Sequence, residues 1–488
     1  MVSHERPDPA GSADRGLPAL AGELLARIRA DPEWRSVLKG EAHIGQAPGR
    51  LDVMGGIADY TGSLVCQMPL ALSTAVLVQR RTDRLLVLKS YNNPVDSRGG
   101  PANFRMSLDD LYGSGSLLAD AVVRARFTGT NHWAAYVAGI FWVLAKGRHL
   151  TGRTKGANIC CYSNIPMGAG LSSSAALEVA ALNAVAGAYH LTLDPLETAV
   201  LAQKVENQIA QAPCGIMDQV ASSLGRRGKL LLLKCQPHTV AGYEDLPAGT
   251  AVVAINSGVK HSIAGSAYRR VRVAAFMAHA IVAAMVRELG LKSDPTGGYL
   301  ANVQPGFYRR YLRLILPREM SGRDFLRSYR HTADTMTHIE PDEKYAIRAA
   351  AEHHIMENQR VERFITALKA AAQDREKNLR RAGRLMLAAH ASYTNRVALG
   401  CRETDFLVRA VVHNGPNKGF YGAKATGGGG GGSIAILMDD SPQNYGILDD
   451  IVHACNGKFS TQALVIRGSG PGASELGILT LVDGGIVG

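Results

Sequence analysis

The sequence predicts an α+β protein with two domains. Its 488 residues exceed the usual size of a single hydrophobic core. The first half is rich in short apolar runs of strand length, whereas the second half alternates helical patterns with short strands. Hydrophobic residues make up 46% of the chain and charged residues 20%, which is typical of an ordinary globular protein. We therefore expect ample core material and little disorder away from the ends.

The first 19 residues predict a loose tail, because prolines and glycines stand among charges and no apolar stretch has the length of a signal peptide. The longest apolar stretch, 133–145, is too short to span a bilayer and predicts a buried helix. Seven cysteines form an odd set without CxxC spacing, which favours reduced thiols. These features favour a cytoplasmic protein with no membrane partner.

The early part of the chain predicts a layer of strands followed by helices. A turn is expected at Pro48-Gly49-Arg50, because proline and glycine mark turns. The strand 157–162 leads into a glycine-rich turn, and an Ala- and Leu-rich helix follows it. A second helix is expected to end at Pro213. The expected strands are 42–44, 51–54, 75–79, 85–88 and 157–162, and the expected helices are 174–189 and 195–212.

The later part predicts helices alternating with strands. Strands 230–233 and 251–255 flank a domain boundary near residues 240–250. We divide the chain into a tail and lead-in helix at 1–40, a first domain at 41–245 and a second at 246–488. The later elements are expected as helices 273–289, 358–372, 379–391 and 403–412, and as strands 433–438, 462–466 and 477–481.

The net charge of +12 would by itself admit a nucleic-acid partner or an anionic substrate. Arginines concentrate in 309–330, where a solvated basic face is the simpler explanation. Neither zinc-finger spacing nor a basic motif interleaved with aromatic residues supports DNA or RNA binding. The arginines are Arg309, Arg310, Arg313, Arg318, Arg323, Arg327 and Arg330.

Two glycine-rich turns predict a bipartite site that handles phosphate. Six consecutive glycines, 427–432, precede the apolar run 433–438, and a second turn lies at 166–176. A flexible linker would usually be longer, mixed with serine and flanked by polar residues. The six-glycine run is followed by a strand rather than a helix, so its match to the dinucleotide-binding pattern G-x-G-x-x-G fails on context. Walker A spacing is absent from the chain.

The upstream turn has the chemistry of an anion site. A turn that leads into a helix exposes backbone N–H groups and the positive end of the helix dipole. Gly168 and Gly170 permit close approach, while the serines at 172–174 cap the helix or offer a hydroxyl to Mg²⁺. A capping role alone is the alternative, but the preceding Pro-x-Gly-x-Gly favours phosphate binding.

Three carboxylates, Asp59, Glu206 and Asp218, lie in otherwise apolar segments, where acids usually have a partner or a role. Phosphoryl transfer needs Mg²⁺, a cation near the transferring group and a residue that orients or deprotonates the attacking hydroxyl. Glu206, Arg50 and Asp218 are suited to these roles. A structural ion pair between Arg50 and Asp218 is equally compatible with the spacing.

Three ordered motifs resemble the GHMP kinase superfamily and, within it, the galactokinase-like sugar kinases. Residues 48–62 look like the first motif, 166–176 like the second, ATP-binding motif, and 424–432 like the third. The resemblance covers roughly 41–481. It implies an N-terminal domain like ribosomal protein S5 domain 2, a ferredoxin-like C-terminal domain and an active site between them.

One departure concerns the sugar. Galactokinases carry Gly-Glu-His-Thr-Asp-Tyr in the first motif, whereas this chain has Gly-Gly-Ile-Ala-Asp-Tyr at 55–60. The latter version is similar to the kinase portion of plant L-arabinokinases. L-Arabinose has the ring stereochemistry of D-galactose but lacks the C6 hydroxymethyl group. A site for L-arabinose therefore needs no hydrogen-bond partner for a 6-hydroxyl, and Gly56 and Ile57 can replace the polar residues. An unpaired buried polar group would cost about 1 to 3 kcal/mol.

The resemblance implies an ATP- and Mg²⁺-dependent sugar-1-kinase, with L-arabinose as the expected substrate. A galactokinase and a non-catalytic sugar and ATP sensor are the alternatives. Sugar and ATP are the expected partners, and the sequence predicts no oligomeric state.

The same resemblance assigns roles to individual residues. Asp218 would face the anomeric hydroxyl, and Arg50 would stabilise the transferring phosphoryl group. Ser174 and Glu206 would hold Mg²⁺. The expected phosphate-binding residues are Pro166, Gly168, Ala169, Gly170, Leu171, Ser172, Ser173 and Ser174. The expected sugar-binding residues are Gly56, Ile57, Asp59, Tyr60, Tyr268, Gly428 and Gly429.

Overall fold

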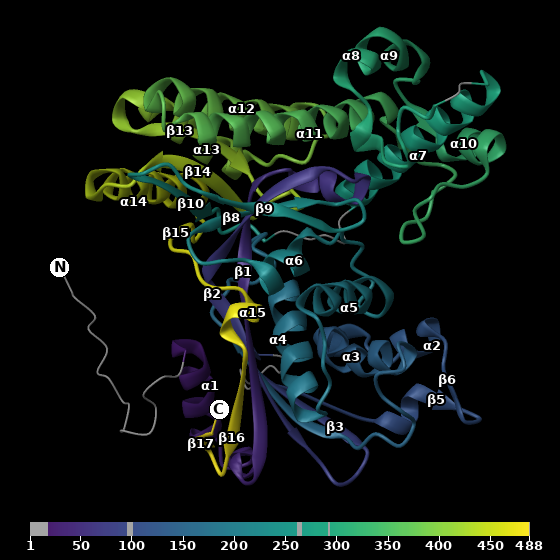
Figure 1. The fold of residues 1–488 in the computed structure, drawn as a ribbon, viewed down its shortest axis with the longest axis vertical. Coiled ribbons are helices and arrows are strands. Elements are labelled where there is room, and N and C mark those ends of the chain that lie inside the picture. Colours follow the sequence, from purple (N-terminus) through teal and green to yellow (C-terminus); the bar gives the residue numbers. More distant parts are fainter. Residues whose placement is uncertain (1–17, 95–100, 261–265, 291–292, 488) are drawn as a thin grey trace.

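The computed structural model describes residues 18–94, 101–260, 266–290 and 293–487 (Figure 1). The expected tail lies almost entirely outside the described residues. The lead-in helix is present as α1 (Ala19–Ala30), which packs its buried leucines against the first sheet.

A nine-stranded sheet extends from the lower part of the molecule in Figure 1 to its middle, where β8 and β9 lie. Its main path runs β17-β16-β1-β2-β7-β3-β4, and β8 and β9 extend it from β2. Among the described residues of this sheet, β3 and β7 pair in parallel and the other paired strands are antiparallel. The strands first in chain order are β1 (Glu41–Met54), β2 (Leu64–Arg80), β3 (Leu85–Pro94), β4 (Pro101–Ser107), β7 (Ala157–Ser163), β8 (Lys229–Lys234) and β9 (Thr239–Asp245).

The turn expected at Pro48-Gly49-Arg50 is wrong. β1 continues through these residues, and its pairing with β2 shifts register between Pro48 and Arg50. A bulge accommodates the proline, which cannot donate to the ladder. Gly49 is required by close approach, because a Cβ there would lie 2.6 Å from the carbonyl oxygen of Leu171.

Helices cover both faces of this sheet (Figure 1). On one face lie α3 (Ala135–Lys146), α4 (Ser173–Ala188), α5 (Pro195–Gln208) and α6 (Met217–Leu224), and α1 lies on the other. The apolar stretch 133–145 is the buried helix α3, as expected. Within the described residues, no helix combines the length and apolar character that a membrane span needs.

A second, four-stranded antiparallel sheet lies in the upper part of the molecule, in the order β13-β14-β10-β15. Long helices pack over it, with α11 and α12 lying across the top of Figure 1. The strands are β10 (Thr250–Asn256), β13 (Phe420–Ala425), β14 (Ser433–Asp439) and β15 (Leu464–Ile466). The helices are α7 (Ser266–Glu288), α11 (Ile347–Ala370), α12 (Arg375–Asn395), α13 (Arg402–Asn414) and α14 (Pro442–Phe459).

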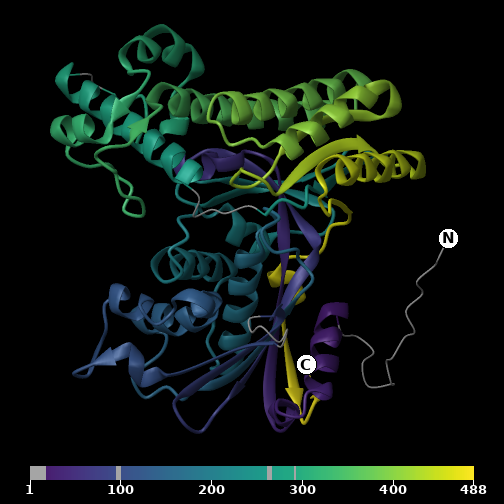
Figure 2. The same ribbon diagram turned by 180° about the vertical axis from the view of Figure 1, so that it is seen from behind.

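The end of the chain returns to the first sheet. β16 (Ile478–Val482) pairs with β1, and β17 (Gly485–Ile486) pairs with β16. Figure 2 shows this yellow strand beside the purple strand and helix of the N-terminal part. The expected strand 477–481 therefore belongs to the large sheet, and the division at residues 245 and 246 stays a prediction.

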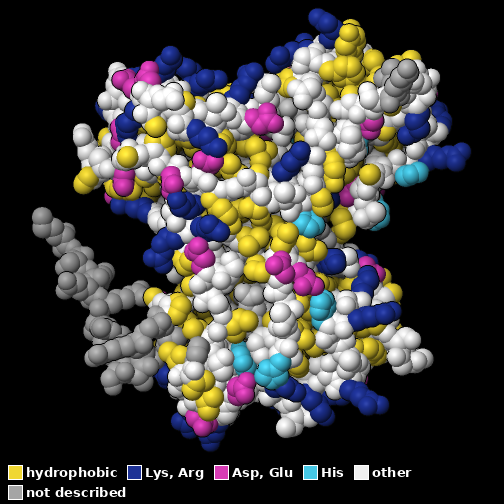
Figure 3. All heavy atoms as spheres, viewed as in Figure 1, with side chains coloured by type: hydrophobic (Ala, Val, Ile, Leu, Met, Phe, Trp, Pro, Cys, Tyr) yellow, Lys and Arg dark blue, Asp and Glu magenta, His cyan; other side chains and the backbone are white. Residues whose placement is uncertain are grey.

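The arginines of 309–330 are all exposed, as a solvated basic face requires. They lie on a helical lobe made of α8 (Pro305–Phe307), a π-helical turn (Tyr308–Leu312), α9 (Arg313–Ile315) and α10 (Gly322–Tyr329). On the face shown in Figure 3, Lys and Arg side chains are spread over the helical part rather than gathered into one strip.

Candidate functional site

The two glycine-rich turns lie against each other, although more than 200 residues separate them in the chain. Ser433 Oγ donates a hydrogen bond of 2.7 Å to the carbonyl oxygen of Ala169. A Cβ at Gly427 would lie 3.0 Å from the carbonyl oxygen of Gly170, and one at Gly432 would lie 3.0 Å from that of Ala169. The six-glycine run is thus a tight connection between β13 and β14, not a linker, and the two turns lie together.

The upstream turn presents the N-terminus of α4 to a pocket. Gly168 and Gly170 both have φ of +72°, a conformation that glycine adopts without strain. Ser172 also has a positive φ, and its buried Oγ has no hydrogen-bond partner. The first turn of a helix leaves N–H groups unpaired and carries the positive end of the dipole. This arrangement suits a phosphate group.

Arg50 and Asp218 form an ion pair in the lining of that pocket. Arg50 Nε and Nη2 lie 2.8 and 2.7 Å from Asp218 Oδ1, and Nη1 donates to the carbonyl oxygen of Gly170 at 2.8 Å. Arg50 is 3% exposed. Its contact with Gly170 ties β1 to the phosphate-binding turn. The same pocket is lined by both residues together with Gly168, Gly170, Leu171, Ser172, Ser173, Ser174, Glu206, Gly427 and Gly428.

Glu206 lies in a buried group of acids. Its Oε2 accepts a hydrogen bond of 2.6 Å from Gln219 Nε2, which also lies 3.4 Å from Glu178 Oε2. Burial, with the nearby Asp218 charge, raises the pKa of Glu206 to about 7, and the Ser174 side chain opposes that rise. Burial and Glu206 raise the pKa of Glu178 well above its ordinary value. Sequence analysis missed Glu178, whose signal was a lone acid within an Ala-rich helix.

The Glu206 carboxylate and the Ser174 hydroxyl are oxygen donors of the kind that Mg²⁺ prefers. Several buried acids with few cations between them also favour a bound cation, which would stabilise the ionised form of Glu206. The residues present therefore fit the expected metal. Among the described residues, no group of three His, Cys, Asp or Glu side chains forms a separate metal site.

Asp59 lies in the 3-10 turn Gly56–Thr61, which follows β1. It is 6% exposed, and a Cβ at Gly215 would lie 1.8 Å from its Oδ2, so only glycine fits there. Burial, with the nearby Asp218 charge, raises the pKa of Asp59 to about 7. Asp59 and Asp218 are thus close enough to influence each other electrostatically.

Ile57 faces an aromatic cluster. It is 2% exposed and packs in one buried cluster with Tyr268 and Tyr393. Gly56 has φ of +56°, and a Cβ there would lie 3.7 Å from the Tyr393 ring. Tyr60 makes an edge contact with Tyr268, with ring centroids 6.2 Å apart. Ile57 and Tyr268 therefore share an apolar wall.

The Tyr60 hydroxyl is directed into the second half of the chain, where it pairs with His354 Nε2 at 3.2 Å. Tyr393, which sequence analysis missed, donates its hydroxyl to the carbonyl oxygen of Gly427 at 2.5 Å. A Cβ at Gly429 would lie 2.9 Å from that hydroxyl. Tyr393 therefore joins the six-glycine turn to the aromatic cluster.

A buried ion pair links the first and third motifs. Lys424 Nζ lies 2.5 Å from Asp52 Oδ2, and the two residues are 1% and 0% exposed. Both Asp52 oxygens accept the Gly56 N–H at 3.1 Å, and Gln67 Nε2 donates to Oδ1 at 2.8 Å. Burial would raise the pKa of Asp52, but the charges of Lys424 and Arg50 hold it below its ordinary value. Sequence analysis missed this pair.

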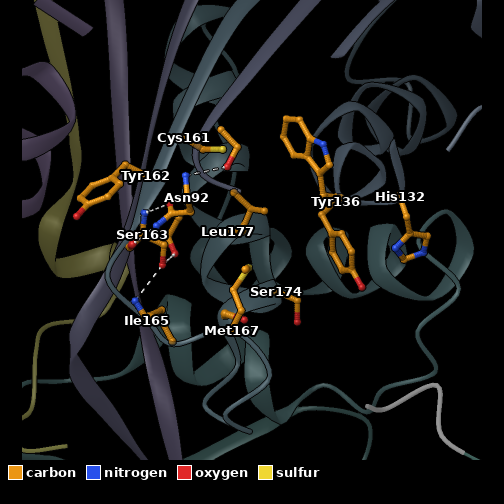
Figure 4. A pocket seen from close by; sticks show the side chains of 14 residues that line it. Asn92, His132, Tyr136, Cys161, Tyr162, Ser163, Ile165, Met167, Ser174 and Leu177 are labelled. Carbon is orange, nitrogen blue, oxygen red and sulfur yellow. Dashed lines mark hydrogen bonds between the residues drawn. The ribbon is translucent and has the colours of Figure 1, made fainter. Parts of the chain in front are cut away.

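A second pocket, of about 280 Å³, adjoins the first (Figure 4). Tyr136 and His132 lie on one side of it and the strand residues Cys161 to Ser163 on the other, with Leu177 between them. The two pockets share His132, Tyr136, Ser173 and Ser174, so they form one continuous groove.

Two family models match parts of the chain. Residues 135–226 match the GHMP kinases N terminal domain, and residues 33–80 match the galactokinase galactose-binding signature. The first match includes α3 to α6 with the phosphate-binding turn, and the second includes β1 with the Asp59 turn. The matched segments are thus those that carry most of the candidate site.

Curated relatives agree with these matches. The chain is 35% identical to the L-arabinokinase of Arabidopsis thaliana over 493 aligned positions. This alignment covers 90% of this chain and 47% of that protein. The chain thus spans about half the length of that relative. It is 28% identical over 422 positions to the galactokinase of Pyrococcus furiosus, covering 86% of this chain and 95% of that one.

Solved structures share the fold. The galactokinase of Lactococcus lactis complexed with galactose has a TM-score of 0.66 at 23% identity, covering 93% of this chain and 98% of that one. The mevalonate kinase of Methanococcus jannaschii has a TM-score of 0.50 at 15% identity, covering 88% and 98%. The expected α+β fold class is confirmed.

Proposed function

We propose that this chain is a GHMP kinase that transfers the γ-phosphoryl group of ATP to the anomeric hydroxyl of a monosaccharide. One observation carries the proposal. Arg50, Asp218, Glu206 and the serines at the start of α4 line a single pocket that both glycine turns enclose. Phosphoryl transfer depends chiefly on positioning and on charge stabilisation, and these residues supply both.

The groove would hold ATP along its length. The flat base fits the second pocket, where Tyr136, Leu177 and Ile165 offer apolar and aromatic surface (Figure 4). The phosphates would then lie at the N-terminus of α4 and against Gly427 and Gly428. Glu206 and Ser174 would hold Mg²⁺, whose charge neutralises phosphate oxygens in such reactions.

The reacting centre would lie between Asp218 and the end of the triphosphate. Asp218 would accept a hydrogen bond from the anomeric hydroxyl and orient it for attack on the γ-phosphorus. A bond then forms between the anomeric oxygen and that phosphorus, the bond to the leaving oxygen of ADP breaks, and the hydroxyl proton is released to Asp218 or to water. Arg50 lies beside Asp218, where its charge would stabilise the transferring group.

We further propose L-arabinose as the substrate and L-arabinose 1-phosphate as the product. Ile57 presents an apolar surface beside Tyr268 where galactokinases carry a histidine. A pentose without a C6 hydroxymethyl group leaves no polar atom unsatisfied against that surface. The identity to an L-arabinokinase supports the same choice. D-Galactose is the second candidate, which the match to the galactose-binding signature favours.

The test is ADP release by purified protein with Mg²⁺-ATP. The panel is L-arabinose, D-galactose, D-xylose, D-glucuronate and no sugar, with Asp218→Asn as the control. Turnover of L-arabinose well above D-galactose, abolished in the control, is the expected result. A preference for D-galactose would support the proposed phosphoryl transfer but would reject L-arabinose as the substrate. Sugar and ATP binding without any turnover would identify a sensor instead of an enzyme.

A further inference from the structure

Arg272 is a buried cation beside the candidate sugar site that the proposed mechanism does not use. It lies on α7, one turn after Tyr268, and is 5% exposed. Its Nε and Nη2 donate to the two oxygens of Asp334 at 2.9 and 3.0 Å. The Asp334 side chain is 2% exposed and accepts from the Thr337 hydroxyl at 2.5 Å and the Met336 N–H at 3.0 Å. The guanidinium is therefore held in one orientation.

The third nitrogen of this guanidinium has no partner. Nη1 is buried and makes no hydrogen bond of ordinary geometry with any described residue, although the Tyr268 hydroxyl lies near the guanidinium. The rings of Tyr60 and Phe276 lie 5.0 and 5.5 Å from the guanidinium carbon, so packing as well as Asp334 restricts its movement. A buried donor that is left unpaired destabilises the protein, because it has lost its hydrogen bond to water without gaining another. Such a group usually has a ligand or an ordered water as its partner.

The free nitrogen lies on the side of the guanidinium away from Asp334. Because Asp334 occupies the edge formed by Nε and Nη2, Nη1 points away from that carboxylate. The guanidinium is close enough to Asp59 and Tyr268 to interact electrostatically with both. The geometry agrees, because the Tyr60 ring, which follows Asp59 in the chain, lies 5.0 Å from the guanidinium carbon and makes an edge contact with Tyr268.

We infer that Arg272 Nη1 donates a hydrogen bond to a hydroxyl oxygen of the bound sugar, and that the Arg272–Asp334 pair thereby helps to determine sugar specificity. This inference rests on the proposed function. A sugar hydroxyl both donates and accepts, so the Asp59 carboxylate and the Arg272 guanidinium are complementary partners for one hydroxyl or for two adjacent ones. A rigid donor selects the hydroxyl that lies in its direction, because a misplaced hydroxyl leaves Nη1 unpaired.

The experiment measures kcat/KM for wild type and Arg272→Gln with the accepted sugar and with its 2-, 3- and 4-deoxy analogues. We expect Arg272→Gln to lower kcat/KM about 10- to 100-fold for the parent sugar and for two of the analogues. The analogue without the hydroxyl that Arg272 contacts should lose no further activity in the variant. The KM for ATP should not change.

Arg269→Gln is the matched control, because Arg269 lies one turn earlier on α7 and pairs with the partly exposed Glu343 at 2.6 Å. It should leave the whole sugar profile unchanged. An equal loss on every analogue, or a loss that appears in the KM for ATP, would mean that Arg272 only maintains structure and would overturn the inference.

Two further measurements keep the test decisive. If Arg272→Gln does not fold, Arg272→Lys replaces it, since lysine keeps the charge but lacks the planar fork that pairs with Asp334. If wild type turns over no sugar, the proposed function fails, and calorimetric sugar affinities replace kcat/KM in the same comparison. The selective pattern would then still support the role of Arg272, whereas equal losses on all analogues would reject it.

Discussion

At the scale of single residues, the substrate proposal depends on Gly56 and Ile57. A Gly56→Glu, Ile57→His double variant restores the galactokinase residues and should shift the ratio of kcat/KM toward D-galactose about 10- to 100-fold. Because Gly56 has a positive φ, a side chain there adds about 1 to 2 kcal/mol of strain. The single variant Ile57→His avoids this strain and is measured alongside the double variant. ADP release with both sugars measures the ratio. An unchanged ratio in two folded variants would remove Ile57 from the account of specificity.

Asp59 gives the ligand-free protein a defined pH dependence. Its pKa is about 7 in the folded chain against an ordinary value of 3.8, so between these values the folded state holds a proton that the unfolded state has released. The free energy of unfolding should therefore fall as pH rises from about 4 to about 7, by at most about 1.4 kcal/mol per pH unit from this group. Above pH 7 its contribution to the slope ends.

Urea unfolding of wild type and Asp59→Asn between about pH 4 and pH 7 measures that contribution. The difference between their free energies of unfolding isolates Asp59, because the contributions of the other titrating groups largely cancel. The wild type should lose stability relative to the variant as pH rises. Parallel curves for the two proteins would show that Asp59 titrates alike in both states.

Sequence reasoning reached Arg50, Glu206 and Asp218 through their apolar sequence context and through motif resemblance, and the structure brings them into one pocket. It did not predict the Asp52–Lys424 ion pair, because the two residues lie far apart in the chain. The residues next to Asp52 in its apolar strand give no indication of which cation pairs with it. Tyr393 and Arg272 were missed for the same reason: only tertiary packing places them beside the 3-10 turn. The local sequence pattern does not show which distant residues pair with each other.

At the scale of elements, the Asp52–Lys424 pair joins β1 to β13 and holds the Gly56 turn. Lys424→Met should cost about 3 to 5 kcal/mol, because it leaves a charged carboxylate buried without its partner. The double variant Asp52→Asn, Lys424→Met removes both charges and should recover much of that loss. A double-mutant cycle by urea unfolding measures the coupling. Simple additivity of the two single losses would contradict a direct interaction.

The contact between the two glycine turns makes a prediction about Gly432. Its φ is +78°, and a Cβ would lie 3.0 Å from the carbonyl oxygen of Ala169, so Gly432→Ala should displace the turns and lower both stability and turnover. Gly446 lies within α14 with open space around its Cβ position, and Gly446→Ala is the matched control. That control should raise stability by about 0.4 to 1 kcal/mol. Thermal unfolding and ADP release compare the two, and equal behaviour would refute the packing argument.

Element boundaries show where local patterns failed. The helix expected at 358–372 begins earlier, at Ile347, because the first turns of α11 bury His353, His354 and Glu357 and so hide the apolar period. The helix expected to reach 212 ends at Gln208, since Gln211 adopts a positive φ ahead of Pro213. Buried polar residues and prolines thus explain both differences.

At the scale of the whole molecule, the chain end belongs to the first sheet. Leu481 of β16 is fully buried in one cluster with Trp34, Leu24 and Ile44, so the two ends of the chain share a core. A division of the chain into independent units at residues 245 and 246 would separate these partners. The architecture instead makes the stability of the N-terminal sheet depend on residues near the C-terminus.

Leu481→Ala tests that dependence, because it removes a buried side chain and should cost about 2 to 5 kcal/mol. The three tryptophans, Trp34, Trp133 and Trp142, all lie in the first half, so their fluorescence reports on that half alone. In urea, the variant should lower the midpoint of the fluorescence transition. Ile478→Ala, on the same strand but 37% exposed, should lower it much less. Leu481→Ala could instead leave the fluorescence midpoint in place and change only the circular dichroism transition. The second half of the chain would then unfold as a separate unit, and the pairing of β16 with β1 would contribute little to the stability of the first half.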